Sequence, residues 1–232
     1  MAAQQTLVDS ETYLKSGAHI GTRFKSWEMK KYIFKIRKDG LNVLDVGTLD
    51  ERIKFAANFL ARFPPQKILV VARKLYTQTP VRVFAQAIGA KAIAGRFVPG
   101  TLTNPKAANF FEPLVVFTAE PEPDAQAIEE ARKANIPVIS LASTNNSLRN
   151  IDLAIPTNNK GRKSLALVYW LLAREFLKAT NAIKEDAEFT KTLEDFEYKM
   201  QEGEKEESFE RSTERGRFGK PNKRFDNRRS RE

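Results

Sequence analysis

The sequence lacks several of the residues on which catalytic and metal chemistry depend. Its 232 residues include no cysteine and a single histidine, His19. A disulfide or a cysteine-based zinc site therefore cannot form, and a Ser/His/Asp triad could use only His19. Neither of the glycine-rich motifs that cradle phosphate follows an apolar strand pattern. We therefore expect no enzyme activity, no metal and no cofactor.

Long apolar runs are also missing. No stretch of about 18 apolar residues occurs, so we expect no membrane span. Residues 1–14 lack the charged and apolar regions of a signal peptide, and the absence of cysteine fits a reducing compartment. We therefore expect a cytoplasmic protein without a membrane partner.

Positive charge is in excess and is unevenly distributed. The chain has 39 Lys and Arg against 29 Asp and Glu, a net charge of +10. Residues 1–183 hold 26 basic and 15 acidic side chains, residues 184–210 hold 4 and 11, and residues 211–232 hold 9 and 3. A surplus of this size indicates a polyanionic partner, most often nucleic acid. The alternative is a basic protein without such a partner.

Short apolar runs alternate with helical patterns through most of the chain, which predicts an α/β fold with a parallel sheet flanked by helices. An Asp-Gly turn between residues 32–36 and 41–46 predicts an N-terminal β-hairpin. The other expected strands are 67–72, 92–97, 114–118, 136–142 and 151–156. The expected helices are 9–17, one that follows a capping box at Thr48 and Glu51, 80–88, 124–134 and 162–178.

The composition changes after residue 183, and we predict three parts: an α/β domain over 1–183, an acidic amphipathic helix over 184–207 and a basic Arg/Gly-rich tail over 208–232. The helix carries a narrow apolar stripe of four residues spaced by 4, 3 and 4: Phe189, Leu193, Phe196 and Met200. The stripe docks either on a neighbouring protein or on the chain's own domain. The tail cannot build a core, and its composition is typical of disordered RNA-binding segments.

Three clusters carry donors and positive charge without catalytic groups. The first, the hairpin cluster (residues 19–38), has one acid, Glu28, and seven basic residues: Arg23, Lys25, Lys30, Lys31, Lys35, Arg37 and Lys38. Phe24, Trp27 and Tyr32 lie between them. Cations pair with phosphates and flat rings stack on unpaired bases, so this pattern favours RNA over a solvated strand face with core aromatics.

The second cluster, the glycine loop, is "GRFVPGTLTNPK" (95–106), and the third, the basic cap, is "PTNNKGRKS" (156–164) just before a predicted helix. Gly95 and Gly100 allow close approach of a partner, and a helix start attracts anions. We expect RNA contacts from the following residues: Arg96, Thr101, Thr103, Asn104, Lys106, Asn158, Asn159, Lys160, Arg162, Lys163 and Ser164. The alternatives are a mere connecting loop and ordinary helix capping.

Carboxylates also follow one predicted strand, at Glu120, Glu122 and Asp124. We interpret them as negative charge that favours the start of the helix 124–134. An α/β nucleotide-binding enzyme remains an alternative, because "STNNS" (143–147) could line a crevice beyond the strand ends.

Several long motifs in order resemble one family. They are "SGAHIGTRFKSWEMKKYIFKIRKDGLNVLDVGTLDERI", "GRFVPGTLTNP", "NIPVISLA" and "IDLAIPTNNKGRKSLALVYWLLAREFL". Over about residues 7–183 the chain resembles the ribosomal protein S2 family of the small subunit, whose eukaryotic branch is also called SA or laminin-receptor-like. The short distance from Asn104 to Leu114 is similar to archaeal or eukaryotic members, and we favour the archaeal type. One departure from the family pattern is "LASTNN" (141–146), which we interpret as altered loop packing.

The resemblance implies a flavodoxin-like sheet and a structural role in the small subunit of cytoplasmic ribosomes, at the junction of head and body. It implies 16S-type rRNA and neighbouring ribosomal proteins as partners, no cofactor and no homo-oligomer. By motif it implies RNA contacts for the following residues: Arg23, Lys25, Trp27, Lys30, Lys31, Arg96, Thr101, Thr103, Asn104, Asn159, Lys160, Arg162 and Lys163. We add Lys35, Arg37 and Lys106 to the expected RNA contacts because of their positive charge. A free RNA-binding regulator outside the ribosome is the other reading.

Overall fold

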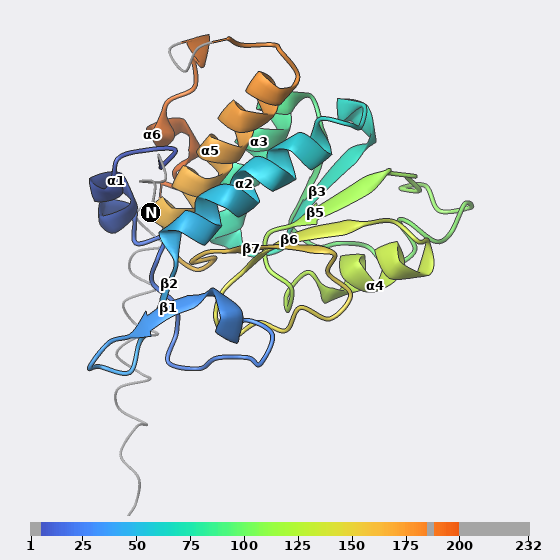
Figure 1. The fold of residues 1–232 in the computed structure, drawn as a ribbon. Coiled ribbons are helices and arrows are strands. Elements are labelled where there is room, and N and C mark those ends of the chain that lie inside the picture. The colour runs from blue at the N-terminus through green and yellow to red at the C-terminus, as the bar shows by residue number, and fades with distance from the viewer. Residues whose placement is uncertain (1–5, 185–187, 200–232) are drawn as a thin grey trace, which may run out of the picture. The chain divides into compact units, whose positions relative to one another are not determined.

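The computed structural model describes residues 6–184 and 188–199, and the largest element of the fold is a five-stranded parallel sheet (Figure 1). Its strands are β3 (Ile68–Ala72), β4 (Lys91–Ala94), β5 (Val115–Thr118), β6 (Val138–Ala142) and β7 (Leu153–Pro156). They lie in the order β4-β3-β5-β6-β7. Numbered from β3, this is the 2-1-3-4-5 order of flavodoxin-like sheets. The predicted α/β fold class is therefore confirmed.

Helices cover both faces of the sheet (Figure 1). Three pack on one face, and the fourth packs on the other. The three are α2 (Val46–Leu60), α3 (Leu75–Ile88) and α5 (Arg162–Ala179), and the fourth is α4 (Ala125–Lys133). A 3-10 turn, η2 (Pro65–Lys67), leads into β3.

Neighbouring residues of strand β3 belong to different cores. Ile68 and Val70 join the core under α2, α3 and α5, whereas Leu69 and Val71 join the core under α4. All four are fully buried. A parallel strand covered on both faces has no polar side to alternate with, which explains why this segment reads as a continuous apolar run.

Three aromatic rings tie the larger core together. Phe84 of α3, Phe117 of β5 and Tyr169 of α5 have ring centroids 5.5–5.9 Å apart in tilted and edge-on arrangements. Such geometry is favourable beyond the burial of area. The fully buried Tyr169 hydroxyl has a pKa raised well above its usual range by loss of hydration.

The N-terminal part forms a second, smaller sheet. Helix α1 (Ser10–Ser16) is followed by the turn η1 (Lys30–Tyr32) and by the antiparallel strands β1 (Ile33–Ile36) and β2 (Asn42–Leu44). The predicted hairpin is thus confirmed. Its base is anchored by a third apolar cluster with the following members: Met29, Tyr32, Leu44, Ala142 and Ala154.

Two predicted helix starts are wrong. Helix α2 begins one turn early, because the Asp45 carboxylate accepts the backbone N–H of Gly47 at 3.3 Å and of Thr48 at 3.2 Å. Helix α3 begins at Leu75, ahead of the predicted start at Pro80, so the proline lies inside the helix and not at its first position. In the first turn, the Thr77 hydroxyl donates to Lys74 O at 2.6 Å, and the helix continues through Pro80.

The segment after α5 folds back onto the domain. In residues 188–199 the helical part is α6 (Leu193–Phe196), not the long helix expected over 184–207. Phe196 is fully buried in the larger core, and Phe189 packs against Trp170 at 6.0 Å between centroids. The compact unit runs to Tyr198, beyond the boundary at 183 that composition indicated. Met200 and the basic tail 208–232 lie outside the described residues.

In residues 6–184 and 188–199, none of the helices combines the length and the apolar character that crossing a lipid bilayer requires.

Candidate nucleic-acid interface

The hairpin cluster presents its cations to the outside. All seven basic side chains are exposed. Over the part of the chain that the structure describes, only Arg37 among them has an acidic partner, Asp39, at 3.1 Å. An exposed pair of this kind is weak. The cluster therefore carries a nearly uncompensated positive charge.

The backbone under these cations is fixed by the loop after β6. Thr144, which is fully buried, accepts Thr22 N–H on its hydroxyl at 2.8 Å and Ser26 N–H on its carbonyl at 2.8 Å. The buried Asn42 amide donates to Thr22 O at 2.6 Å. Bonds over such sequence distances hold the cluster on a rigid frame, as an electrostatic binding surface requires.

Gly21 packs closely against Thr144 and Asn42. A Cβ at this position would meet Thr144 Cγ2 at 2.4 Å and Asn42 O at 2.9 Å. We expect Gly21→Ala to lower the free energy of unfolding by about 1–3 kcal/mol, the usual cost of overpacking. Urea unfolding monitored by circular dichroism measures it.

A second substitution tests the cause. Thr144→Ser removes the closest methyl group and keeps the hydroxyl that accepts Thr22 N–H. The Gly21→Ala/Thr144→Ser variant should therefore recover part of the loss, which a double-mutant cycle detects. An unchanged midpoint for Gly21→Ala alone would contradict the close contact.

The aromatic residues of the hairpin cluster separate into two kinds. Trp27 and Phe24 are 85% and 80% exposed, whereas Tyr32 is buried at the hairpin base. Lys30 Nζ lies 5.7 Å from the centre of the Trp27 ring, and Lys31 Nζ lies 5.0 Å from the Tyr32 ring. The predicted mixture of cations and accessible rings thus exists around Trp27.

The basic cap uses its neutral side chains internally. Asn158 Oδ1 accepts the N–H groups of Lys160 and Gly161 at 3.2 and 3.3 Å, and the Ser164 hydroxyl donates to Asn158 O at 2.7 Å. Asn159 has no exposed surface; its amide donates to Leu141 O at 3.1 Å. These amides therefore shape the loop, and Asn159 is buried where we expected an RNA contact.

The cations of the basic cap remain exposed at the start of helix α5. Lys160, Arg162 and Lys163 all reach solvent. The first turn of α5 has no acidic residue, and Gly161 provides no side-chain cap. Cations at the positive end of a helix dipole are unfavourable until an anion neutralises them. The arrangement suits a phosphate group.

The glycine loop is held by Glu130 of α4. The buried Glu130 carboxylate accepts Gly100 N–H at 2.7 Å and Leu102 N–H at 3.0 Å, while Gly100 adopts φ +90°. Thr101 is buried, and its hydroxyl donates to Val98 O at 2.6 Å, in place of the expected RNA contact. Of the loop residues expected to contact RNA, Arg96, Thr103, Asn104 and Lys106 are exposed.

The structure joins two of the three clusters. Asn158 Nδ2 and N–H donate to Gly17 O at 3.1 Å and to Ala18 O at 2.9 Å, so the basic cap contacts the segment that leads into the hairpin cluster. The basic cap follows the carboxyl end of β7, and the hairpin cluster is bonded to Thr144 in the loop after β6. The glycine loop follows β4, the strand at the opposite edge of the sheet.

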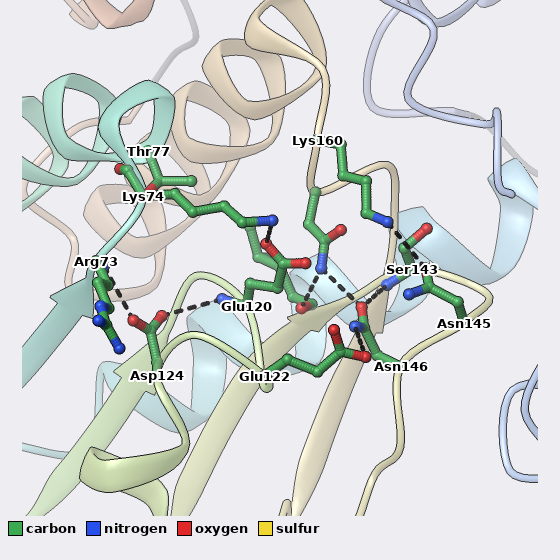
Figure 2. Close-up of polar contacts among 12 residues, drawn as sticks. Arg73, Lys74, Thr77, Glu120, Glu122, Asp124, Ser143, Asn145, Asn146 and Lys160 are labelled. Carbon is green, nitrogen blue, oxygen red and sulfur yellow. Dashed lines mark hydrogen bonds and ion pairs between the residues drawn. The ribbon is translucent and has the colours of Figure 1, made fainter. Parts of the chain in front are cut away.

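The carboxyl ends of β3 and β5, where such sheets bind nucleotides, are filled by the chain itself (Figure 2). The Asp124 carboxylate accepts Arg73 N–H at 2.9 Å and Glu120 N–H at 3.2 Å, and Glu120 pairs with Lys74. Burial raises the pKa of Asp124 to about 6. Asp124 is the N-cap residue of α4, as its expected place at the helix start requires, but its side chain makes no cap bond to the helix.

The "STNNS" loop closes the rest of this edge (Figure 2). Asn146 Oδ1 accepts Ser143 N–H and Asn159 Nδ2–H, each at 2.9 Å, and Asn146 Nδ2 donates to Glu122 at 3.3 Å. These bonds occupy several of the polar groups at this edge, while Ser143 Oγ and Asn159 Oδ1 are buried without a hydrogen-bond partner among the described residues. The edge is therefore held by the chain's own side chains, and the nucleotide-binding alternative has no support from these bonds.

Among the described residues, no group of three His, Asp or Glu side chains is arranged to hold a metal ion. His19 Nδ1 lies 3.3 Å from Tyr13 O, within the N-terminal packing. Sequence reasoning missed Asn42 and Glu130, and it missed the role of Asp124 and Thr144; all four hold the loops from a distance.

Comparison with known proteins agrees with this picture. The family model "Ribosomal protein S2" matches residues 13–110 and 106–179. The "Small ribosomal subunit protein uS2" of Picrophilus torridus is 47% identical over 200 residues, which is 86% of this chain and 100% of the relative. That of Thermoplasma acidophilum is 52% identical over 194 residues, 84% of this chain and 98% of the relative. The chain belongs to the ribosomal protein S2 family.

Proposed function

We propose that this protein is a structural constituent of the small ribosomal subunit that binds 16S-type rRNA at the junction of head and body. The observation that carries the proposal is the joined surface of the hairpin cluster and the basic cap. Its cations lie on backbone fixed by Thr144 and Asn158. The relatives are named as small ribosomal subunit proteins, which supports the same assignment and a role outside enzyme catalysis.

The mechanism of binding is electrostatic and shape-matched. Each cation that pairs with a phosphate releases a condensed counterion, and a rigid frame avoids the entropy loss of ordering the loops on binding. The glycine loop offers Arg96 and Lys106 as a separate contact at the other sheet edge. Co-sedimentation of the protein with small subunits through a sucrose gradient separates this role from that of a free RNA-binding regulator.

The salt dependence of rRNA binding tests the basic cap. Lys160→Ala/Arg162→Ala removes two phosphate contacts, so log K against log salt should become shallower by about 2, with binding at moderate salt weakened about tenfold or more. Filter binding to 16S-type rRNA over a KCl series measures both values.

A matched control removes the same number of positive charges from surface positions outside the three clusters. Arg82→Ala/Lys133→Ala removes two exposed cations from α3 and α4, outside the three clusters. This variant should keep the wild-type slope within error. Equal slopes for the two variants would mean that net charge, not the basic cap, governs binding.

We also propose that the C-terminal segment contacts a neighbouring ribosomal protein through its exposed side. Phe189 and Phe196 are engaged within the chain, which leaves Leu193 and the acidic Glu188 and Glu194 outside. A photoreactive residue at position 193 should crosslink to a protein in assembled subunits. Exclusive crosslinking to rRNA would contradict this contact.

A further inference from the structure

A pocket of about 780 Å³ opens beside the hairpin cluster. Its wall is formed by Trp27, Lys30 and Lys31, by Arg52 of α2, and by the loop that leads into β7. This volume lies within the range of roughly 300–1,000 Å³ that small-ligand sites occupy. The pocket is therefore large enough for one nucleotide.

The floor of the pocket is apolar. Tyr32, Leu148, Ile151 and Ala154 line it. Tyr32 and Ala154 belong to the third apolar cluster under the hairpin, and Leu148 and Ile151 pack against that cluster. Trp27 stands at the pocket with 85% of its surface exposed. A large ring left in water beside an apolar floor provides a face on which another flat group can stack.

The charge in the pocket is positive, because its three cations outnumber its two acids, and both acids are held by the chain's own backbone. Glu28 accepts Leu148 N–H at 2.5 Å, and Asp152 accepts Val138 N–H at 2.8 Å. The three cations point instead over aromatic rings. Lys30 lies 5.7 Å from the Trp27 ring, and Lys31 and Arg52 lie 5.0 and 5.5 Å from the Tyr32 ring.

We propose that this pocket receives a single unpaired nucleotide extruded from the RNA. Its base stacks on Trp27, and its flanking phosphates pair with Lys30, Lys31 and Arg52. The inference rests on the proposed function and deepens it, since it names the RNA element that the hairpin cluster recognises. A base-paired nucleotide presents no free face for stacking, so the pocket selects an unpaired one.

Fluorescence of Trp27 tests the stacking directly. The chain has two tryptophans, so Trp170→Phe in the full-length protein leaves Trp27 as the only one. The probes are a short RNA duplex with one bulged adenosine, the same duplex with an abasic bulge, and the fully paired duplex. We expect the bulged adenosine to quench Trp27 and to bind about 5- to 100-fold more tightly than the abasic probe, as one stacked base provides.

Substitution of Trp27 gives the second measurement. Trp27→Ala should abolish the preference for the bulged adenosine over the abasic probe, whereas Trp27→Phe, which keeps a stacking face, should retain part of it. Trp27 is almost fully exposed, so both variants should unfold at the wild-type urea concentration. A preference that survives in Trp27→Ala would overturn the proposal.

The remaining outcomes separate the pocket from the proposed function. Equal binding of the three duplexes without quenching overturns the pocket, while a steep salt dependence with 16S-type rRNA keeps the proposed function. Failure of every short duplex, with 16S-type rRNA still bound, also overturns the pocket. Failure to bind any of these RNAs overturns both.

Discussion

Phe196→Ala is expected to lower the free energy of unfolding by about 3–4 kcal/mol, as large-to-small changes at fully buried aromatic residues do. Phe196 has no exposed surface and belongs to the larger core, although it lies in an acidic segment beyond α5. The loss combines the lost burial with the cavity that remains. Urea unfolding of the full chain, followed by circular dichroism, measures it.

A neighbouring residue provides the control. Leu193 lies on the same short helix α6 and is 37% exposed. Leu193→Ala should therefore cost well under half as much. If both variants cost the same small amount, the segment is not part of the core, and the stripe is free to dock elsewhere.

Local opening sets an upper limit on the effect. Residues 188–199 can detach while the sheet stays folded, in which case the loss cannot exceed the stability of that attachment. Hydrogen exchange at Trp170 Nε1, which donates to Lys191 O at 2.9 Å, reports this opening separately. In Phe196→Ala we expect its exchange to accelerate before that of amides in β5.

The C-terminal segment also shows what an apolar stripe can and cannot predict. The spacing of Phe189, Leu193 and Phe196 indicates one apolar side, but it does not say which surface covers that side. The helix begins at Leu193 because Thr192 and Asp195 form a capping box there. The Thr192 and Asp195 spacing is present in the sequence and predicts a helix that starts at Leu193.

The strands could be predicted because burial on both faces demands continuous apolar runs. Each of the five lies within a few residues of its expected position. Helix starts were harder, since they depend on which of several polar residues caps the first turn. Asp45, not Thr48, caps the first turn of α2. Pro80 lies inside α3 and does not start it.

The cations of the site could be predicted because Lys and Arg stay exposed unless a partner buries them. The neutral donors could not. Thr101 and Asn159 have the residue types of an RNA contact but are buried, and their side chains bond within the chain. Glu130 holds the glycine loop across 30 residues, a pairing that local patterns do not contain.

Asp124→Asn is expected to remove a pH-dependent term of about 3 kcal/mol from the stability of the protein. In the folded state, burial raises the pKa of Asp124 from its ordinary 3.8 to about 6, although its carboxylate accepts Glu120 and Arg73 N–H groups. The folded state therefore binds this proton more tightly than the unfolded state. Each pKa unit corresponds to about 1.4 kcal/mol, which gives the size of the term.

The sign follows from the proton balance. The stabilisation is complete below about pH 4 and is lost as the pH rises through about 6, because the carboxylate must then be buried with its charge. Asn stays neutral throughout. The free energy of unfolding of Asp124→Asn, relative to the wild type, should therefore rise by about 3 kcal/mol between about pH 4 and pH 7. A loss that does not depend on pH is added, because the Asn amide accepts fewer of the two N–H groups.

Urea unfolding of both proteins at several pH values in this range measures the difference, which cancels the titration of the other carboxylates. Asp39→Asn serves as the control, since it makes the same substitution at an exposed carboxylate, which pairs with Arg37. Parallel stability curves for Asp124→Asn and the wild type would show that Asp124 keeps its ordinary pKa. The ends of β3 and β5 would then admit water or an ion, and the buried arrangement of Asp124 would have to be abandoned.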